Sequence, residues 1–248
     1  MKKIRIYFSS DFQENTDFIK EIDGPAINVD LSILVNHYRK MGEKNLKYVE
    51  KFIPLWENEF EDGLFEPKAR IALMSFYNMK KKFGCFVDYG KVNINMSALM
   101  VWTVGEEIER KSSSLMSLRG DLMLGCLLDV AGSIALYGMH KILLKWINDN
   151  VGKSSGNFLS GEVYPGLIST TKDLMDKIEV SGHTKDTIGV SAQGNLMLKP
   201  RKTQCSFVGL GPETHLEKLP VMPCYPCSGK KCLYYQLGGC HMDLFAAK

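Results

Sequence analysis

The 248-residue sequence lacks a strong excess of charge of either sign. It has 31 basic and 28 acidic residues and a formal net charge of +3. Its longest basic run is Lys80-Lys81-Lys82, so the clustered Lys/Arg pattern of a nucleic-acid-binding domain is missing and no nucleic-acid partner is expected. Internal repeats and low-complexity tracts are missing too. With 45% hydrophobic and 24% charged residues, the composition is that of a globular chain and excludes disordered or collagen-like proteins.

A secretory leader is also lacking. The first residues have a basic tip, but no apolar run of about 7–15 residues follows it, which predicts a cytoplasmic protein. The most apolar stretch, from Leu122 to Met139, carries one charged residue, Asp129. A membrane span needs about 20 apolar residues, and a central Asp opposes insertion. We therefore expect a buried core helix here and no membrane partner.

The order of periodic segments predicts an α+β fold rather than regular βαβ winding. Strands are expected within the first ten residues and at 83–89, 96–103, 188–190, 196–198 and 205–208. Helices are expected at 30–60 with a break at Pro54, from Pro67 to Tyr77, and at 105–118, 121–150 and 169–178. Asp121 is the expected N-cap of the long helix. The α+β domain is expected to span residues 1–219, and a cysteine-rich tail 220–248.

Four of the seven cysteines lie close together near the C-terminal end. They are Cys224, Cys227, Cys232 and Cys240. Two cysteines separated by two residues can hold one metal, and a third and fourth complete its shell. Clustered cysteines in a cytosolic chain more often bind metal than form disulfides. The uneven spacing favours an iron–sulfur cluster, most simply 4Fe-4S, over structural zinc. Cys205 and His241 are alternatives for the fourth ligand, and free surface thiols are the least favoured interpretation.

Asp129 is the most unusual residue outside the tail, because a carboxylate in an apolar helix needs a partner. It either pairs with a backbone amide or Arg119, or contacts the amine of a ligand. The acidic segment 105–109 is better explained as the start of a helix than as catalytic carboxylates. The five histidines share no recognisable spacing, and no local catalytic or nucleotide-binding motif occurs. The sequence therefore identifies no catalytic residue and leaves open whether the protein is an enzyme.

Several segments, taken in order, resemble a known family. They are WTVGEEIE (102–109), RGDL (119–122), LDVAGS (128–133), SGEVYP (160–165), IGVS (188–191), LMLKPRK (196–202) and the Cys-x2-Cys-x4-Cys of the tail. This series resembles the activation (reactivation) domain of vitamin B12-dependent methionine synthase, in the free-standing form found in anaerobes. The resemblance covers roughly residues 65–235, and it is carried by the order and spacing of the segments rather than by any one motif.

In methionine synthase this domain binds S-adenosylmethionine and docks over the corrinoid, so that inactive cob(II)alamin is reduced and remethylated. The resemblance implies a bent antiparallel sheet flanked by helices and an accessory role in corrinoid metabolism. A free-standing copy would dock on a separate corrinoid protein or corrinoid-dependent methyltransferase, with its iron–sulfur tail as the route for electron transfer. The candidate ligand-binding residues are Gly161, Glu162, Tyr164 and Asp129.

Two departures from the family pattern concern S-adenosylmethionine. Between Gly152 and Tyr164 the family's arginine is missing, and Lys153 is the only basic residue. The family's Thr-Glu-Ser is replaced by Gln-Gly-Asn at 193–195. Lysine cannot reproduce the planar fork with which a guanidinium binds a carboxylate, so binding in the family's manner is not expected. The alternative function is an S-adenosylmethionine- or corrinoid-binding module with a structural zinc tail and no electron transfer. A weaker one is a scaffold that has lost the ligand pocket.

Overall fold

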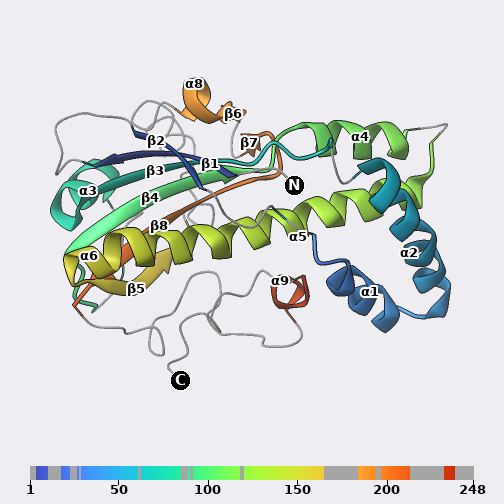
Figure 1. Ribbon diagram of the computed structural model, residues 1–248, viewed down its shortest axis with the longest axis horizontal. Coiled ribbons are helices and arrows are strands. Elements are labelled where there is room, and N and C mark those ends of the chain that lie inside the picture. Colours follow the sequence, from blue (N-terminus) through green and yellow to red (C-terminus); the bar gives the residue numbers. More distant parts are fainter. Residues whose placement is uncertain are drawn as a thin grey trace.

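The computed structural model describes residues 4–10, 18–22, 27, 29–60, 63–84, 89, 92–117, 120–164, 184–193, 197–212 and 232–237. These residues form a mixed α/β fold built on a six-stranded sheet (Figure 1). In spatial order the strands are β2 (Phe18–Ile22), β1 (Ile4–Ser10), β3 (Lys68–Ser75), β4 (Met96–Thr103), β8 (Thr203–Gly211) and β5 (Phe158–Val163). A second, two-stranded sheet pairs β6 (Ser191–Gln193) with β7 (Met197–Lys199).

The main sheet is mixed, whereas a wholly antiparallel sheet was expected. Its neighbouring strands are antiparallel except for β1 and β3, which pair in parallel with Arg5 opposite Lys68. A parallel pair needs a long crossover connection. Here the chain supplies it by passing through β2 and two helices before it enters β3.

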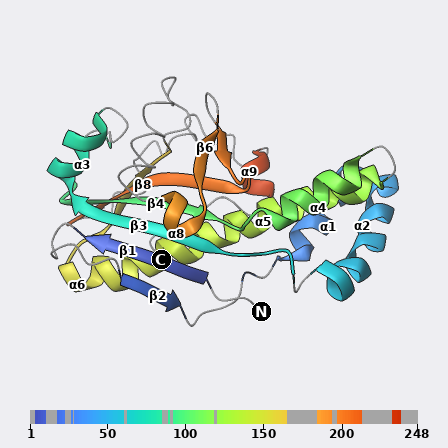
Figure 2. The same cartoon turned by 90° about the horizontal axis from the view of Figure 1, so that it is seen from above.

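Helices lie on both faces of the sheet (Figure 2). They are α1 (Leu31–Lys40), α2 (Glu43–Leu55), α3 (Phe76–Phe83), α4 (Glu107–Met116), α5 (Leu122–Ile147), α6 (Lys153–Ser155), α8 (Thr184–Ile188) and α9 (Leu233–Gln236), with π-helical turns at Trp56–Phe60 and Asn148–Gly152. The long helix α5 runs along one face, and α1, α2 and α4 gather around its N-terminal half (Figure 1). Helices α3 and α8 cover the opposite face.

Helix α5 is the core helix that the sequence predicts. The side chain of Asp121 caps it by accepting a hydrogen bond of 3.0 Å from the amide of Leu124. By length and composition alone, α5 with the residues that follow it could cross a membrane. Half of its most apolar stretch is buried inside the fold, however, as expected of a helix that packs on a sheet.

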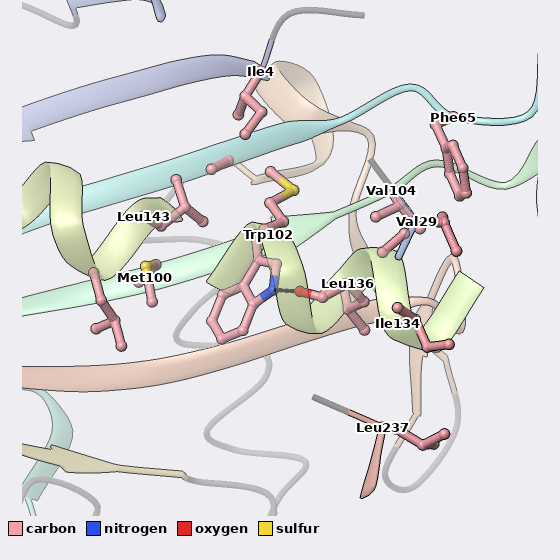
Figure 3. Close-up of a cluster of buried hydrophobic side chains, with 14 of the residues drawn as sticks. Ile4, Val29, Phe65, Met100, Trp102, Val104, Ile134, Leu136, Leu143 and Leu237 are labelled. Atoms are coloured by element: carbon pink, nitrogen blue, oxygen red, sulfur yellow. Dashed lines mark hydrogen bonds between the residues drawn. The ribbon is translucent and has the colours of Figure 1, made fainter. Parts of the chain in front are cut away.

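Strand β4 separates two hydrophobic clusters. Ala98, Met100 and Trp102 face α5 and belong to the larger cluster, part of which is shown in Figure 3. The alternate residues Leu99 and Val101 face the other side and belong to the cluster under α3 and α8. Because both faces of β4 are buried, its sequence is a continuous apolar run, and the strand expected at 96–103 is confirmed.

Two expected elements near β3 are wrong. Residues 68–75 form a strand rather than a helix opened by Pro67. The strand is buried on both faces, so it lacks the alternation that distinguishes a strand from a helix. Phe83 belongs to α3 rather than to the strand expected at 83–89, of which 85–88 lie outside the described residues.

Two further boundaries differ from expectation. Pro54 lies inside α2 rather than ending it, and the chain continues into the π-helical turn at Trp56–Phe60. Proline has no backbone N–H to donate to the helical hydrogen bonds. The π-helical turn that follows is a local change in the same hydrogen-bond pattern. Ile188 is the last residue of α8, so residues 188–190 do not form the expected strand. The next strand is β6, which begins at Ser191. The helix expected at 169–178 lies outside the described residues.

Gly125 allows α4 and α5 to approach closely. A Cβ atom at this position would lie 2.6 Å from Met116 Cγ and 2.9 Å from the carbonyl oxygen of Ser112, whereas nothing lies within 4 Å of one at Gly138. We expect Gly125→Ala to lower the free energy of unfolding by about 1–3 kcal/mol through overpacking. Gly138→Ala, in the same helix, should raise it by about 0.5–1 kcal/mol. Urea denaturation of both variants measures the difference, and equal effects would contradict the close contact.

Candidate functional site

The turn between β7 and β8 binds α4 through Arg201. The backbone amide of Arg201 donates to Glu109 Oε2 at 2.8 Å, and its Nε donates to Oε1 at 2.7 Å. Its Nη2 also donates to Ser113 Oγ at 3.3 Å. Both carboxylate oxygens of Glu109 are thus used in holding the turn. Glu109, in the acidic segment at the start of α4, therefore has a structural role in holding this turn.

The next residue of the turn, Lys202, binds α5. Its Nζ lies 2.9 Å from Asp129 Oδ2 and donates to Ser133 Oγ at 2.9 Å. Gly132 lies on the same part of α5, where a Cβ would meet Ile108 Cδ1 at 3.1 Å. Among the described residues Asp129 therefore pairs with Lys202; the other expected partner, Arg119, lies outside them. The side chain of Asp129 is 36% exposed, so a ligand can also reach it.

A hollow of about 610 Å³ lies beside these contacts. It is lined by Ser113, Met116, Ser117, Cys126, Asp129, Val130 and Arg201. Tyr38 of α1 lies near this lining. Burial raises the pKa of Tyr38 above its usual value, and the neighbouring Cys126 and Asp129 raise it further because they disfavour a second negative charge.

A second polar cluster is buried between α5 and the sheet. His140 Nε2 lies 2.7 Å from Glu162 Oε1, and these two side chains are 0% and 4% exposed. The hydroxyl of Tyr164 donates to Glu162 Oε2 at 3.2 Å and lies 3.4 Å from His140 Nε2. The ring of Trp102 stacks on His140 with centroids 4.8 Å apart and planes 5° apart, and its Nε1 donates to the carbonyl of Leu136 (Figure 3).

The structure divides the candidate ligand-binding residues into two places. Gly161, Glu162 and Tyr164 are together, because Gly161 lies at a bulge in β5 and Glu162 then faces α5. Asp129 lies eleven residues before His140 on α5, or about 16 Å along the helix axis. Sequence reasoning missed His140. No local signal marks it, since its partner Glu162 is 22 residues away on a strand.

Most of the cysteine tail lies outside the described residues, including Cys224, Cys227 and Cys240. Cys232 is described and has a partly exposed free thiol. It lies near Tyr137 of α5, whose pKa is raised by burial first and by Cys232 second. Leu237 is buried in the larger hydrophobic cluster and is drawn with that cluster in Figure 3. Residues 232–237 therefore pack against the main domain beside α5.

The described residues contain no group of three or more His, Cys, Asp or Glu side chains arranged to hold a metal. Cys205, an alternative fourth ligand, lies in the hydrophobic cluster on the face of the sheet opposite α5. Burial raises the pKa of its thiol to about 12, as expected of a buried core cysteine. The sheet thus separates Cys205 from Cys232. His241 lies outside the described residues.

Comparison with known proteins leaves the family open. No family model matches the sequence, and no curated protein is significantly similar to it. A functional proposal therefore depends on the residues and contacts described above.

Proposed function

We propose that the protein is an accessory protein of corrinoid metabolism. It docks on a corrinoid protein or corrinoid-dependent methyltransferase and supports its reductive reactivation through an iron–sulfur cluster carried by the cysteine tail. The proposal includes the finer fold expectation, that the sheet corresponds to the bent sheet of the methionine synthase activation domain. The protein is further proposed to be cytoplasmic.

One observation carries this proposal, namely that the segments of the sequence resemblance meet in space. Glu109, from the first segment, binds Arg201 from the LMLKPRK segment. Asp129 and Ser133, from the LDVAGS segment, bind Lys202. These contacts join residues about 70 to 90 positions apart in the sequence. Their convergence is the arrangement expected if the whole series encodes one domain.

The position of the tail supports the redox part of the proposal. Cys232 is accessible and lies beside α5, which also carries Asp129 and His140. A partly exposed cysteine of this kind suits a cluster ligand, whereas Cys205 is buried on the opposite face of the sheet. When bound, an iron–sulfur cluster supplies one-electron transfer. The role of this protein is to hold the cluster close to the surface that docks on the corrinoid protein.

The test is the metal content of protein purified without oxygen, with Cys232→Ser compared to Cys126→Ser. Both thiols are free and partly exposed, but only Cys232 belongs to the tail. We expect about four iron and four sulfide per chain and a brown colour that bleaches on reduction. Cys232→Ser should lose the iron, and Cys126→Ser should keep it. The iron protein, once reduced, should then convert a cob(II)alamin partner to the cob(I) state.

Other metal contents give different conclusions. About one zinc per chain without colour would contradict electron transfer and support the alternative, a binding module with a structural zinc tail. A chain without metal would make the redox proposal wrong. A chain with iron that never reduces a cob(II)alamin protein would contradict the corrinoid part alone.

A further inference from the structure

The hollow beside α4 and α5 contains two charged side chains whose charges are already balanced. Arg201 is neutralised by Glu109, and Asp129 is neutralised by Lys202. A ligand with a full charge would therefore compete with an ion pair that already exists. A neutral ligand that only forms hydrogen bonds would leave both pairs intact.

Both side chains keep unused hydrogen-bonding groups. Arg201 uses its backbone amide, Nε and Nη2, and no hydrogen bond from the described residues occupies its Nη1. Asp129 pairs with Lys202 through Oδ2, and none of the described residues donates a hydrogen bond to its Oδ1. The hollow therefore presents one charged donor and one charged acceptor. Hydrogen bonds to such charged groups are about twice as strong as those between neutral groups.

The rest of the lining sets the size and polarity of a ligand. Met116, Val130 and Cys126 supply apolar surface, and Ser113 and Ser117 supply hydroxyls. The volume of about 610 Å³ lies within the range of small-molecule sites. The group that matches is small and neutral and carries both a donor and an acceptor. A primary carboxamide has this structure, with a carbonyl for Arg201 and an NH₂ for Asp129.

We propose that this hollow binds primary carboxamides, and specifically the acetamide and propionamide side chains at the edge of a corrin ring. The choice of a corrin rests on the proposed function, whereas the choice of an amide rests on the hollow itself. The described charges favour an amide over the free acid, because a carboxylate would compete with Glu109 for Arg201. The site positions the corrinoid by its edge, and the reacting cobalt lies outside it.

The test measures binding to the full-length protein by the protection of Cys126, which lines the hollow. The probes are dicyanocobinamide, a corrinoid that keeps its amides, and free propionamide. N-ethylmaleimide, which has no primary carboxamide, labels Cys126, and mass spectrometry of its peptide gives the rate. The variants are Arg201→Lys and Asp129→Asn. Matched controls are Arg110→Lys and Asp149→Asn, which alter exposed ion pairs outside the hollow.

We expect cobinamide to protect Cys126, and each hollow variant to weaken its affinity about tenfold, with both controls unchanged. Propionamide should protect only at far higher concentration. Equal protection by the two probes at the same concentration would support the amide site and overturn the corrin as its source. No protection, or unchanged affinity in the hollow variants, would overturn the whole inference. The proposed function is judged separately by iron content and cob(II)alamin reduction, so the two can fail independently.

Discussion

Replacing His140 with leucine is expected to lower the free energy of unfolding by about 3–5 kcal/mol. The substitution leaves the carboxylate of Glu162 buried without the imidazole that lies 2.7 Å from it. It also removes the ring on which Trp102 stacks. Folded domains of this size are stable by only about 5–15 kcal/mol, so a large fraction of the stability would be lost. Urea denaturation followed by circular dichroism measures it.

The double variant His140→Leu/Glu162→Leu shows whether the loss comes from the unpaired charge. When both partners of a buried pair become apolar, the stability is often close to that of the original protein. We therefore expect the double variant to be more stable than His140→Leu alone. Arg110→Leu, which breaks an exposed ion pair with Glu107, is the control and should leave stability unchanged. A double variant less stable than the single one would contradict the role given to the pair.

Trp102→Ala should reduce stability by a similar amount, about 3–5 kcal/mol. The side chain is fully buried against α5 and donates a hydrogen bond of 3.1 Å to Leu136 (Figure 3). Its removal leaves a large cavity between β4 and α5. It also removes the packing that fixes the plane of the His140 ring.

The control for Trp102 is Trp146→Ala on α5, which is only partly buried and makes an edge contact with Phe8. We expect a clearly smaller loss there, because less of the ring leaves contact with the core. If Trp102→Ala does not fold, Trp102→Phe keeps most of the volume and removes the indole donor. Equal losses for Trp102→Ala and Trp146→Ala would show that the position of Trp102 has no special importance.

The elements that the sequence predicts well are those whose local pattern agrees with their final environment. Residues 96–103 are apolar on both faces and form β4, and the long apolar segment after Asp121 forms α5. Strand β3 has the same two-sided burial, but a helical pattern fits its sequence equally well. Length and periodicity could not separate the two possibilities there. Its pairing with β1 is a tertiary effect that no local window contains.

The candidate site likewise contains some residues that the sequence identifies and others that it does not. Glu162 and Tyr164 could be named from the segment that resembles a family, and Asp129 from its unusual position in an apolar helix. The partners of these residues could not be named. Lys202 is 73 positions from Asp129, and His140 is 22 from Glu162. A side chain whose role depends on a distant partner shows nothing in its own neighbourhood of the sequence, and His140 therefore looks like any other histidine.

Helix α5 has a mechanical consequence, because one rigid element of 26 residues carries Asp129, Tyr137 and His140. A ligand that shifts the helix when it fills the hollow displaces the side chain beside Cys232 at the same time. Coupling between two binding equilibria is reciprocal. Under the proposed function, the factor by which hollow occupancy changes the affinity of the tail for a metal would equal the factor by which the metal changes the affinity of the hollow. Through α5, the loading of the tail would set how tightly the partner is held.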